Sequence, residues 1–221
     1  DGRGLNPLLQ NYWMVIHPPV LFLGFASTLI PFAFAMGGMM TKRYREWTTQ
    51  ATPWSFFGVM ALGTGILMGG AWAYEALSFG GYWAWDPVEN MSLVPWLILI
   101  AGIHTHLITQ STGHSLKSTY FFYLLSFALV VYSTFLTRSG VLGDTSVHAF
   151  TDLGMNAQLL GFLLIFVIPY FVLFFARFKH MAEPQKEEAI DSREFWMLIG
   201  SLILFLIGFG ATIFTIPIIF S

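Results

Sequence analysis

Long uninterrupted runs of apolar residues constrain this chain more than any other feature of its sequence. Several stretches of about 20 residues carry no charge, and a helix of that length crosses the roughly 30 Å hydrocarbon core of a bilayer. Only 10% of the 221 residues are charged and 56% are hydrophobic, whereas a soluble domain carries about 25% charged residues. The sequence therefore predicts an all-α polytopic transmembrane bundle.

A hydropathy window of helix length predicts six spans, which form a single transmembrane domain over residues 1–221. The predicted spans are 20–40, 54–74, 93–108, 120–136, 159–176 and 195–220. The third is short for a full crossing, and Pro31, Pro169 and Pro217 predict kinks in their helices. Because the chain opens Asp-Gly-Arg-Gly, without Met and without a positively charged segment before an apolar stretch, we expect it to be a segment of a longer protein.

The distribution of Lys and Arg predicts how the bundle is oriented. Eight of the ten lie in the loops after spans one, three and five, while Arg3 and Arg138 lie on the opposite side. Short loops rich in Lys and Arg stay in the cytoplasm, so the loops 75–95 and 137–156 are predicted to be extracytoplasmic. The stretch 177–194 mixes both signs of charge and is predicted to be a solvated cytoplasmic connector.

Composition excludes several classes of function. A net charge of −2 without a basic face argues against nucleic-acid binding. The chain has no cysteine, which excludes disulfides, thiolate metal sites and a cysteine nucleophile. Any metal site must therefore use His, Met, Tyr or carboxylate ligands.

The densest group of unusual residues is Phe-Gly-Gly-Tyr-Trp-Ala-Trp-Asp-Pro-Val-Glu-Asn, residues 79–90, between spans two and three. Aromatic residues collect at membrane interfaces, so an aromatic belt is one interpretation. A belt explains the two glycines and two carboxylates poorly. The alternative is a platform for a large, flat, apolar ligand such as a porphyrin. Trp83 and Trp85 would supply the stacking surface, and Gly80 and Gly81 would allow close approach.

Two histidines on the same predicted side could ligate the iron of such a porphyrin. His17 lies where span one meets the outer surface, and the following Pro18-Pro19 pair stiffens the chain there. His148 lies in the outer loop after span four. For each, an interfacial histidine satisfied by backbone and water is the alternative, because topology predicts their side of the membrane and not their separation.

Two further histidines lie inside span three, where ionisable residues are rare and indicate function. At 100° per residue, His104 and His106 point to nearly opposite faces, so we expect one of them to face the bundle. His104 lies nine residues beyond Pro95, about 13 Å along the axis, and is predicted to be a ligand near the middle of the membrane. His106 lies nearer the cytoplasmic end, where it could snorkel.

The charged residues at the outer face allow more than one role. Asp86 and Glu89 could form an acid–base pair, but no nucleophile accompanies them, and Asp86 before Pro87 favours a helix cap. Arg138 could pair with a porphyrin propionate or with Asp86, and an interfacial anchor is an equal alternative. No catalytic residue is assigned.

Several of these motifs resemble those of a known protein family. Residues 80–90 resemble the tryptophan-rich WWD motif of the haem-handling proteins of cytochrome c biogenesis. The CcmF branch, the haem lyase subunits, is similar to this chain at the stretch 1–10, the His17-Pro18-Pro19 triplet, and residues 137–142 and 146–150. The resemblance covers about residues 1–150, and Phe79 and Tyr82 stand where this family often has Trp.

The resemblance implies a haem lyase of the holocytochrome c synthase type in the bacterial inner membrane, with its active face in the periplasm. Such proteins take haem from the haem chaperone CcmE and attach it to the Cys-x-x-Cys-His motif of an apocytochrome c that a CcmH-type subunit binds. It implies that His17 and His148 are axial ligands of the substrate haem. It also implies that His104 is one of two ligands of a transmembrane haem b, whose second ligand lies further along the family's sequence. The implied haem-binding residues are Gly80, Gly81, Tyr82, Trp83, Trp85, Asp86, Arg138, His17 and His148.

Two other functions stay open. A membrane haem transporter or exporter would use the Trp-rich loop as an exit vestibule, but five of the six predicted spans lack the internal charges that would mark a polar pathway. A purely structural membrane subunit would need Trp83, Trp85 and Asp86 for assembly and not for haem transfer.

Overall fold

The computed structural model describes residues 4, 6–140, 154–184 and 189–219, with side chains as far as residue 215. Over these residues it is all-helical, and six of its segments are long and apolar enough to cross a membrane. The α-helices are α1 (Tyr12–Ser27), α2 (Leu29–Thr41), α3 (Trp47–Ala76), α4 (Pro87–Ser111), α5 (Leu116–Arg138), α6 (Asn156–Arg177) and α7 (Arg193–Ile219), with 3-10 turns at Pro7–Leu9 and Phe178–His180. The prediction of an all-α bundle with six spans is confirmed.

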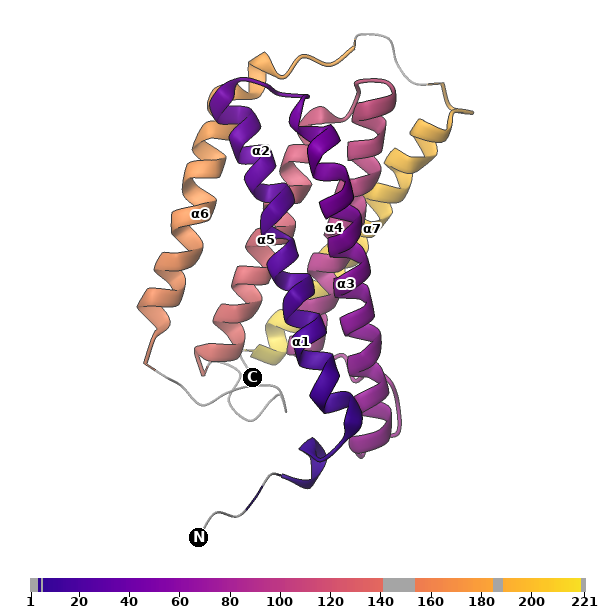
Figure 1. Cartoon of the computed structure of the whole chain (residues 1–221), viewed down its shortest axis with the longest axis vertical. Helices are drawn as coiled ribbons and strands as arrows, with labels where there is room; N and C mark the ends of the chain where they lie inside the picture. Colours follow the sequence, from indigo (N-terminus) through magenta and orange to yellow (C-terminus); the bar gives the residue numbers. More distant parts are fainter. Residues whose placement is uncertain (1–3, 5, 141–153, 185–188, 220–221) are drawn as a thin grey trace.

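The helices run alternately up and down the long axis of the molecule (Figure 1). Helices α1 and α2 together make the first span, which packs along α3, while α4 lies between α5 and α7. The α3–α4 connection and the end of α5 lie at one end of the bundle, which also holds the start of α1 (Figure 1). The α2–α3, α4–α5 and α6–α7 connections lie at the opposite end.

The first span is interrupted at Thr28, three residues before Pro31. Proline has no N–H to donate to the carbonyl four residues earlier, which here belongs to Ser27. The side chains of Ser27 and Thr28 donate to the carbonyls of Gly24 at 2.6 Å and Phe25 at 2.7 Å. The predicted break is thus present one turn before the proline, while α6 and α7 continue through Pro169 and Pro217.

Span three is longer than the sequence suggested, because α4 begins at Pro87 and runs for 25 residues. Asp86 caps this helix by accepting a hydrogen bond from the Val88 N–H at 2.6 Å, and Pro87 occupies the first position, where its missing N–H costs nothing. Pro95 lies inside the helix, and its carbonyl accepts a bond from the Ser126 hydroxyl at 3.0 Å. With 72% of its apolar window buried, α4 is the central helix of the bundle.

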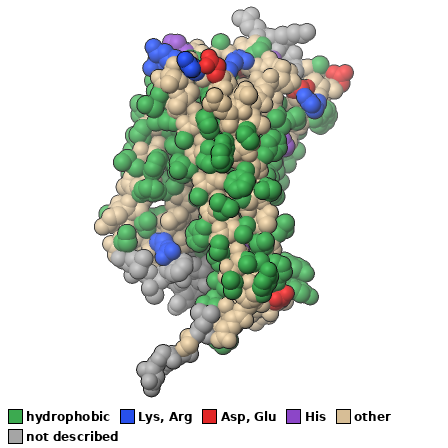
Figure 2. Space-filling model, viewed as in Figure 1, with side chains coloured by type: hydrophobic (Ala, Val, Ile, Leu, Met, Phe, Trp, Pro, Cys, Tyr) green, Lys and Arg blue, Asp and Glu red, His purple; other side chains and the backbone are tan. Residues whose placement is uncertain are grey.

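Aromatic side chains fill the core between α2, α3, α5 and α6. Phe32 stacks on Tyr170 with ring centroids 5.0 Å apart and packs on Phe127 at 4.6 Å. The Trp47 indole N–H donates to the Tyr120 hydroxyl at 2.7 Å. The face shown in Figure 2 is mostly apolar, and a group of Lys and Arg side chains marks the end that carries the α2–α3 connection.

Candidate functional site

The Trp-rich loop is narrower than predicted, because α3 ends at Ala76 and α4 begins at Pro87. Residues 77–86 therefore form the loop, whereas 75–95 was the predicted range. The loop folds back along the last turns of α3. The Tyr82 ring stacks on Tyr74 with centroids 4.4 Å apart and planes 6° apart, and a Cβ added at Gly70 would lie 3.2 Å from the Tyr82 carbonyl oxygen.

The end of this loop is held in a specific backbone conformation by the start of α4. Trp85 has φ of +58°, a left-handed conformation that is costly for a bulky residue. The Asn90 amide donates to the Trp85 carbonyl at 3.1 Å and to the Thr215 hydroxyl of α7 at 3.0 Å. The Glu89 carboxylate accepts from the Ala84 N–H at 2.8 Å and from the Asp86 N–H at 3.3 Å.

These bonds decide between the two interpretations of the carboxylates. Asp86 and Glu89 form a reciprocal capping box at the first turn of α4. Both carboxylates are engaged with backbone N–H groups, so the helix-cap interpretation holds and the acid–base pair does not. Their role is to fix the loop that precedes them.

The two tryptophans of the loop differ in exposure. Trp83 and Trp85 meet edge to face, with centroids 6.4 Å apart and planes at 84°. Trp85 is 61% exposed, and so is Tyr82, which leaves flat apolar surface outside the bundle. The Trp83 indole nitrogen is buried and makes no hydrogen bond to any described residue. Gly80, with φ of +71° and open space around its Cα, lies at the outer turn of the loop.

His17 is held against α3 more tightly than its predicted position at the outer surface implied. Helix α1 begins at Tyr12, so His17 lies in its second turn and is only 9% exposed. Its Nδ1–H donates to the Gly65 carbonyl at 2.7 Å. Because a carbonyl oxygen only accepts, this bond places the proton of the neutral ring on Nδ1. The ring lies directly on Gly69, where an added Cβ would come within 2.6 Å of Cε1.

The structure brings His17 and the Trp-rich loop onto neighbouring positions of α3. The imidazole contacts Gly69, and the backbone of Tyr82 contacts Gly70. Both contacts depend on the absence of a side chain at a glycine, so the helix can approach its two partners closely. His17 and the Trp-rich loop thus pack on consecutive residues of α3.

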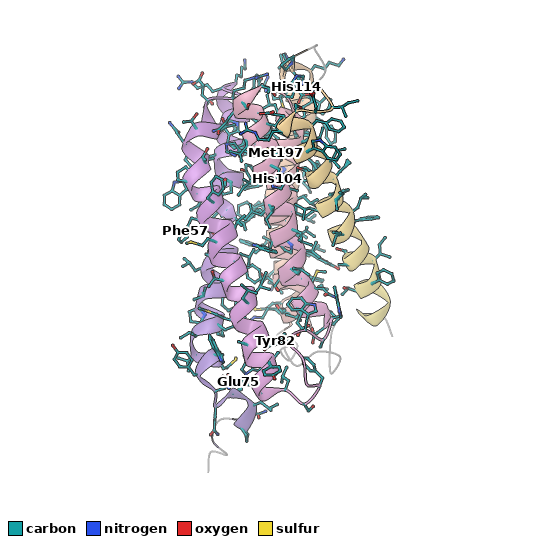
Figure 3. All side chains as sticks on the ribbon, turned by 90° about the vertical axis from the view of Figure 1, so that its right-hand side faces the viewer. Phe57, Glu75, Tyr82, His104, His114 and Met197 are labelled. Atoms are coloured by element: carbon teal, nitrogen blue, oxygen red, sulfur yellow. The ribbon has the colours of Figure 1, made fainter. Side chains whose placement is uncertain are left out.

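A further residue at this end, which the sequence analysis missed, is Glu75 at the end of α3. Its carboxylate accepts from the Asn11 amide and from the Trp13 indole N–H, both at 3.0 Å. The Trp72 indole N–H donates to the Leu8 carbonyl at 3.0 Å. These bonds attach the segment before His17 to α3, and Figure 3 shows Glu75 and Tyr82 at the same end of the molecule. An acidic residue closing an apolar span is the signal that could have found it.

The two remaining predicted site residues are His148 and Arg138. His148 lies outside the described residues, so its pairing with His17 stays a prediction. Arg138 is half-buried in the last turn of α5, at the end of the bundle that holds the Trp-rich loop (Figure 1).

His104 lies in a different part of the bundle, toward the opposite end from Tyr82 (Figure 3). It is 17 residues after Pro87 and seven before Ser111, about 26 Å and 10 Å along the helix axis. His104 therefore lies beyond the middle of α4, and its depth in the membrane stays a prediction. The His104 ring faces Gly200 of α7, and its buried Nδ1 has no hydrogen-bond partner among the described residues.

The sequence left open that the His106 side chain snorkels toward the membrane surface, but in the structure it does not. It is 1% exposed, its Nε2–H donates to the Thr48 carbonyl at 2.8 Å, and its Nδ1 is hydrogen-bonded to the Tyr123 hydroxyl at 2.5 Å. Both ring nitrogens are used within the protein, which joins α3, α4 and α5. His106 is therefore a buried structural residue.

Known proteins are similar to this chain over most of its length. The family model described as "Cytochrome C assembly protein" matches residues 1–142. The cytochrome c-type biogenesis protein CcmF of Pseudomonas aeruginosa is 40% identical, and that of Escherichia coli 36%, in both cases over 92% of this chain and 31% of the relative. A solved structure titled "Cytochrome c Heme Lyase CcmF" aligns with a TM-score of 0.72 and 32% identity over 95% of this chain and 33% of that one. The chain spans about a third of the length of these relatives.

Proposed function

Because the chain belongs to the cytochrome c assembly protein family, we propose that it forms the haem-handling portion of a cytochrome c haem lyase. Its relatives are named as cytochrome c-type biogenesis proteins, and one solved relative as a haem lyase. The observation that carries the proposal is the His17 imidazole, which donates from Nδ1–H to the Gly65 carbonyl and lies against Gly69 of α3, next to the Gly70 that the Trp-rich loop contacts.

In this proposal haem is the substrate, and it binds at the Trp-rich loop. The exposed faces of Trp85 and Tyr82 supply apolar stacking surface. The buried indole N–H of Trp83 is a donor available to a carboxylate or carbonyl oxygen of the ligand. His17 and His148 take the two axial positions of the iron, and Arg138 pairs with a propionate.

The chemistry that follows is an addition, in which the protein's residues position the reactants. Each cysteine thiol of the Cys-x-x-Cys-His motif adds across a haem vinyl group, so that sulfur and hydrogen both end on the haem and no atom leaves. Asp86 and Glu89 contribute by fixing the loop through the cap of α4. The segment before His17, attached through Glu75, keeps the axial ligand in register with the loop.

His104 fits the second haem that this family implies. Its Nδ1 is a buried nitrogen without a partner among the described residues, and it faces a glycine, Gly200, rather than a side chain. His104 would hold the iron of a transmembrane haem b, with the other ligand outside this chain. When bound, that haem would supply the electrons that keep the substrate iron reduced.

The proposed setting is the bacterial inner membrane, with the Trp-rich loop on the periplasmic side. The six spans and the eight-to-two division of Lys and Arg support this orientation. The proposed partners are the haem chaperone CcmE as donor, a CcmH-type subunit that presents the apocytochrome, and the apocytochrome c itself.

The test is a ligand-rescue experiment on the intact protein that contains this chain. We expect His17→Gly to lose the Soret absorbance of loop-bound haem and the maturation of cytochrome c, and we expect added imidazole to restore both in part. Rescue is specific for a lost iron ligand, since imidazole cannot repair a damaged fold.

The exposed His180 provides the matched control, because His180→Gly removes an imidazole at the far end of the bundle. Normal maturation by the His17→Gly variant without imidazole would refute the proposal. Haem accumulation inside sealed vesicles, dependent on the protein and without attachment to apocytochrome, would instead support a haem exporter.

A further inference from the structure

An apolar groove runs along the outside of the first span, far from the Trp-rich loop. It has a volume of about 560 Å³ and lies between α2 and the first turn of α3. Its floor is one face of α2, with side chains repeating at three- to four-residue intervals. The floor is lined by Leu29, Ile30, Ala33, Phe34 and Gly37.

The length and direction of the groove match half a bilayer. From Leu29 to Thr41 the α2 face extends 12 residues, about 18 Å along the helix axis. One leaflet of hydrocarbon is about 15 Å deep. Since α2 runs along the long axis of the bundle (Figure 1), the groove lies parallel to the acyl chains of one leaflet.

One end of the groove is polar and carries positive charge. Arg43 and Glu46 line it there and lie 3.7 Å apart, with both side chains 71% exposed. Such an exposed pair is weak, so the Arg43 guanidinium can exchange its partner for a phosphate, which it binds in a bidentate manner. Lys42 precedes Arg43 in the sequence and adds a second positive charge near this rim, whereas the Arg45 guanidinium donates to the Ala182 carbonyl at 2.6 Å. Figure 2 shows Lys and Arg side chains gathered at this end of the bundle.

The floor of the groove has space that the sequence could have filled. A Cβ added at Gly37 would meet no atom within 4 Å, although glycine inside a helix costs about 1 kcal/mol relative to alanine. At the next position, Gly38, a Cβ would lie 2.4 Å from Cδ1 of Trp47. Gly38 thus allows α2 and α3 to pack, whereas Gly37 leaves the groove open.

We propose that this groove binds an anionic phospholipid, with one acyl chain along α2 and the phosphate on Arg43. The groove and the phospholipid match from end to end. The apolar floor has the depth of one leaflet and receives the acyl chain, and the Arg43 end lies at the level of the headgroup. The carboxylate of Glu46 opposes the lipid charge and sets its affinity.

The experiment uses the intact protein in lipid nanodiscs with a trace of phosphatidylglycerol that carries a photoactivatable group on one acyl chain. We expect cross-links on residues 29–41 and at least fivefold less labelling there by the matching phosphatidylcholine probe, since each basic side chain favours an anionic headgroup by about that factor. Arg43→Gln should remove this preference, and Glu46→Gln should increase it. Both positions are exposed, so neither variant should disturb the fold.

A third variant tests the groove itself. Gly37→Leu should reduce labelling of α2 about tenfold, the effect of displacing two buried methylenes. Gly161→Leu is the matched control, since a Cβ at this α6 position also meets no atom within 4 Å but lies outside the groove. Equal labelling by the two lipids, an unchanged preference in Arg43→Gln, or cross-links to a protein segment in place of α2 would overturn the proposal.

Discussion

The contact between Gly69 and His17 makes the position of the proposed iron ligand testable by a single methyl group. In Gly69→Ala the new Cβ would lie 2.6 Å from Cε1 of His17 and 3.1 Å from each ring nitrogen. Ordinary contact begins near 3.4 Å, so the imidazole must move by about 0.8 Å. Its Nδ1–H bond to Gly65 is 2.7 Å long, and a movement of that size lengthens it to at most about 3.5 Å, the outer limit for a hydrogen bond.

This displacement has a cost in stability and a larger one in ligand geometry. Overpacking costs about 1–3 kcal/mol and the weakened hydrogen bond up to about 1 kcal/mol, whereas replacing glycine by alanine in a helix gains about 1 kcal/mol. We expect a net destabilisation of about 1–3 kcal/mol. Misplacement of a reacting group by about 1 Å reduces the reaction rate on the order of a hundredfold. We therefore expect the yield of mature cytochrome c to fall strongly while the protein stays folded.

The measurements are the Soret spectrum of the purified intact protein, the yield of mature cytochrome c and a thermal unfolding curve. Gly161→Ala is the control, because its added methyl group meets no atom within 4 Å. We expect that control to keep wild-type haem content. Wild-type Soret absorbance and maturation in Gly69→Ala would show that the His17 position is not set by α3, and the geometric reasoning would fail.

Three further predictions concern residues around and beyond the loop. Glu75→Leu removes the acceptor of the Asn11 and Trp13 bonds, so amide hydrogen exchange in residues 8–16 should become about tenfold faster, while exchange in α5 stays unchanged. His106→Phe leaves buried hydrogen-bonding partners unsatisfied and should lower the free energy of unfolding by about 1–3 kcal/mol; calorimetry measures this, and His180→Phe at an exposed site should show no effect. His104→Ala should abolish the reduced-minus-oxidised difference spectrum of haem b and leave loop-bound haem in place; survival of that spectrum would rule out His104 as its ligand.

The number of membrane spans could be predicted from the sequence because each span is a long apolar run, but hydropathy alone did not give the ends of the helices. Hydropathy placed the start of span three near residue 93, whereas α4 begins at Pro87. Asp86, Pro87 and Glu89 are polar or helix-breaking residues, so they fall outside an apolar window. In the structure Asp86 and Glu89 form a capping box with Pro87 at the first helical position, and α4 therefore begins before the apolar run. Similarly, α1 starts at Tyr12 through an Asn11 cap, which lies outside any hydropathy window.

The candidate site was predictable in its residue types and not in its contacts. The side of the membrane on which His17 lies follows from the charge distribution, but its partner, the Gly65 carbonyl, is 48 residues away on another helix. Glycines at 65 and 69 are spaced for close helix packing, and only the register of α1 against α3 shows that His17 occupies that position. The identity of the buried partner of His106 is likewise a tertiary property.

The position of His104 bears on how the two proposed haems relate to one another. The capping box begins α4 at the Trp-rich loop, and His104 lies 17 residues later on the same helix, about 26 Å along its axis. No single planar ligand can contact both ends of that distance, so the loop and His104 belong to separate sites. Because the intervening helix is the most buried of the bundle, the separation is rigid, and loss of either site should leave the haem of the other bound.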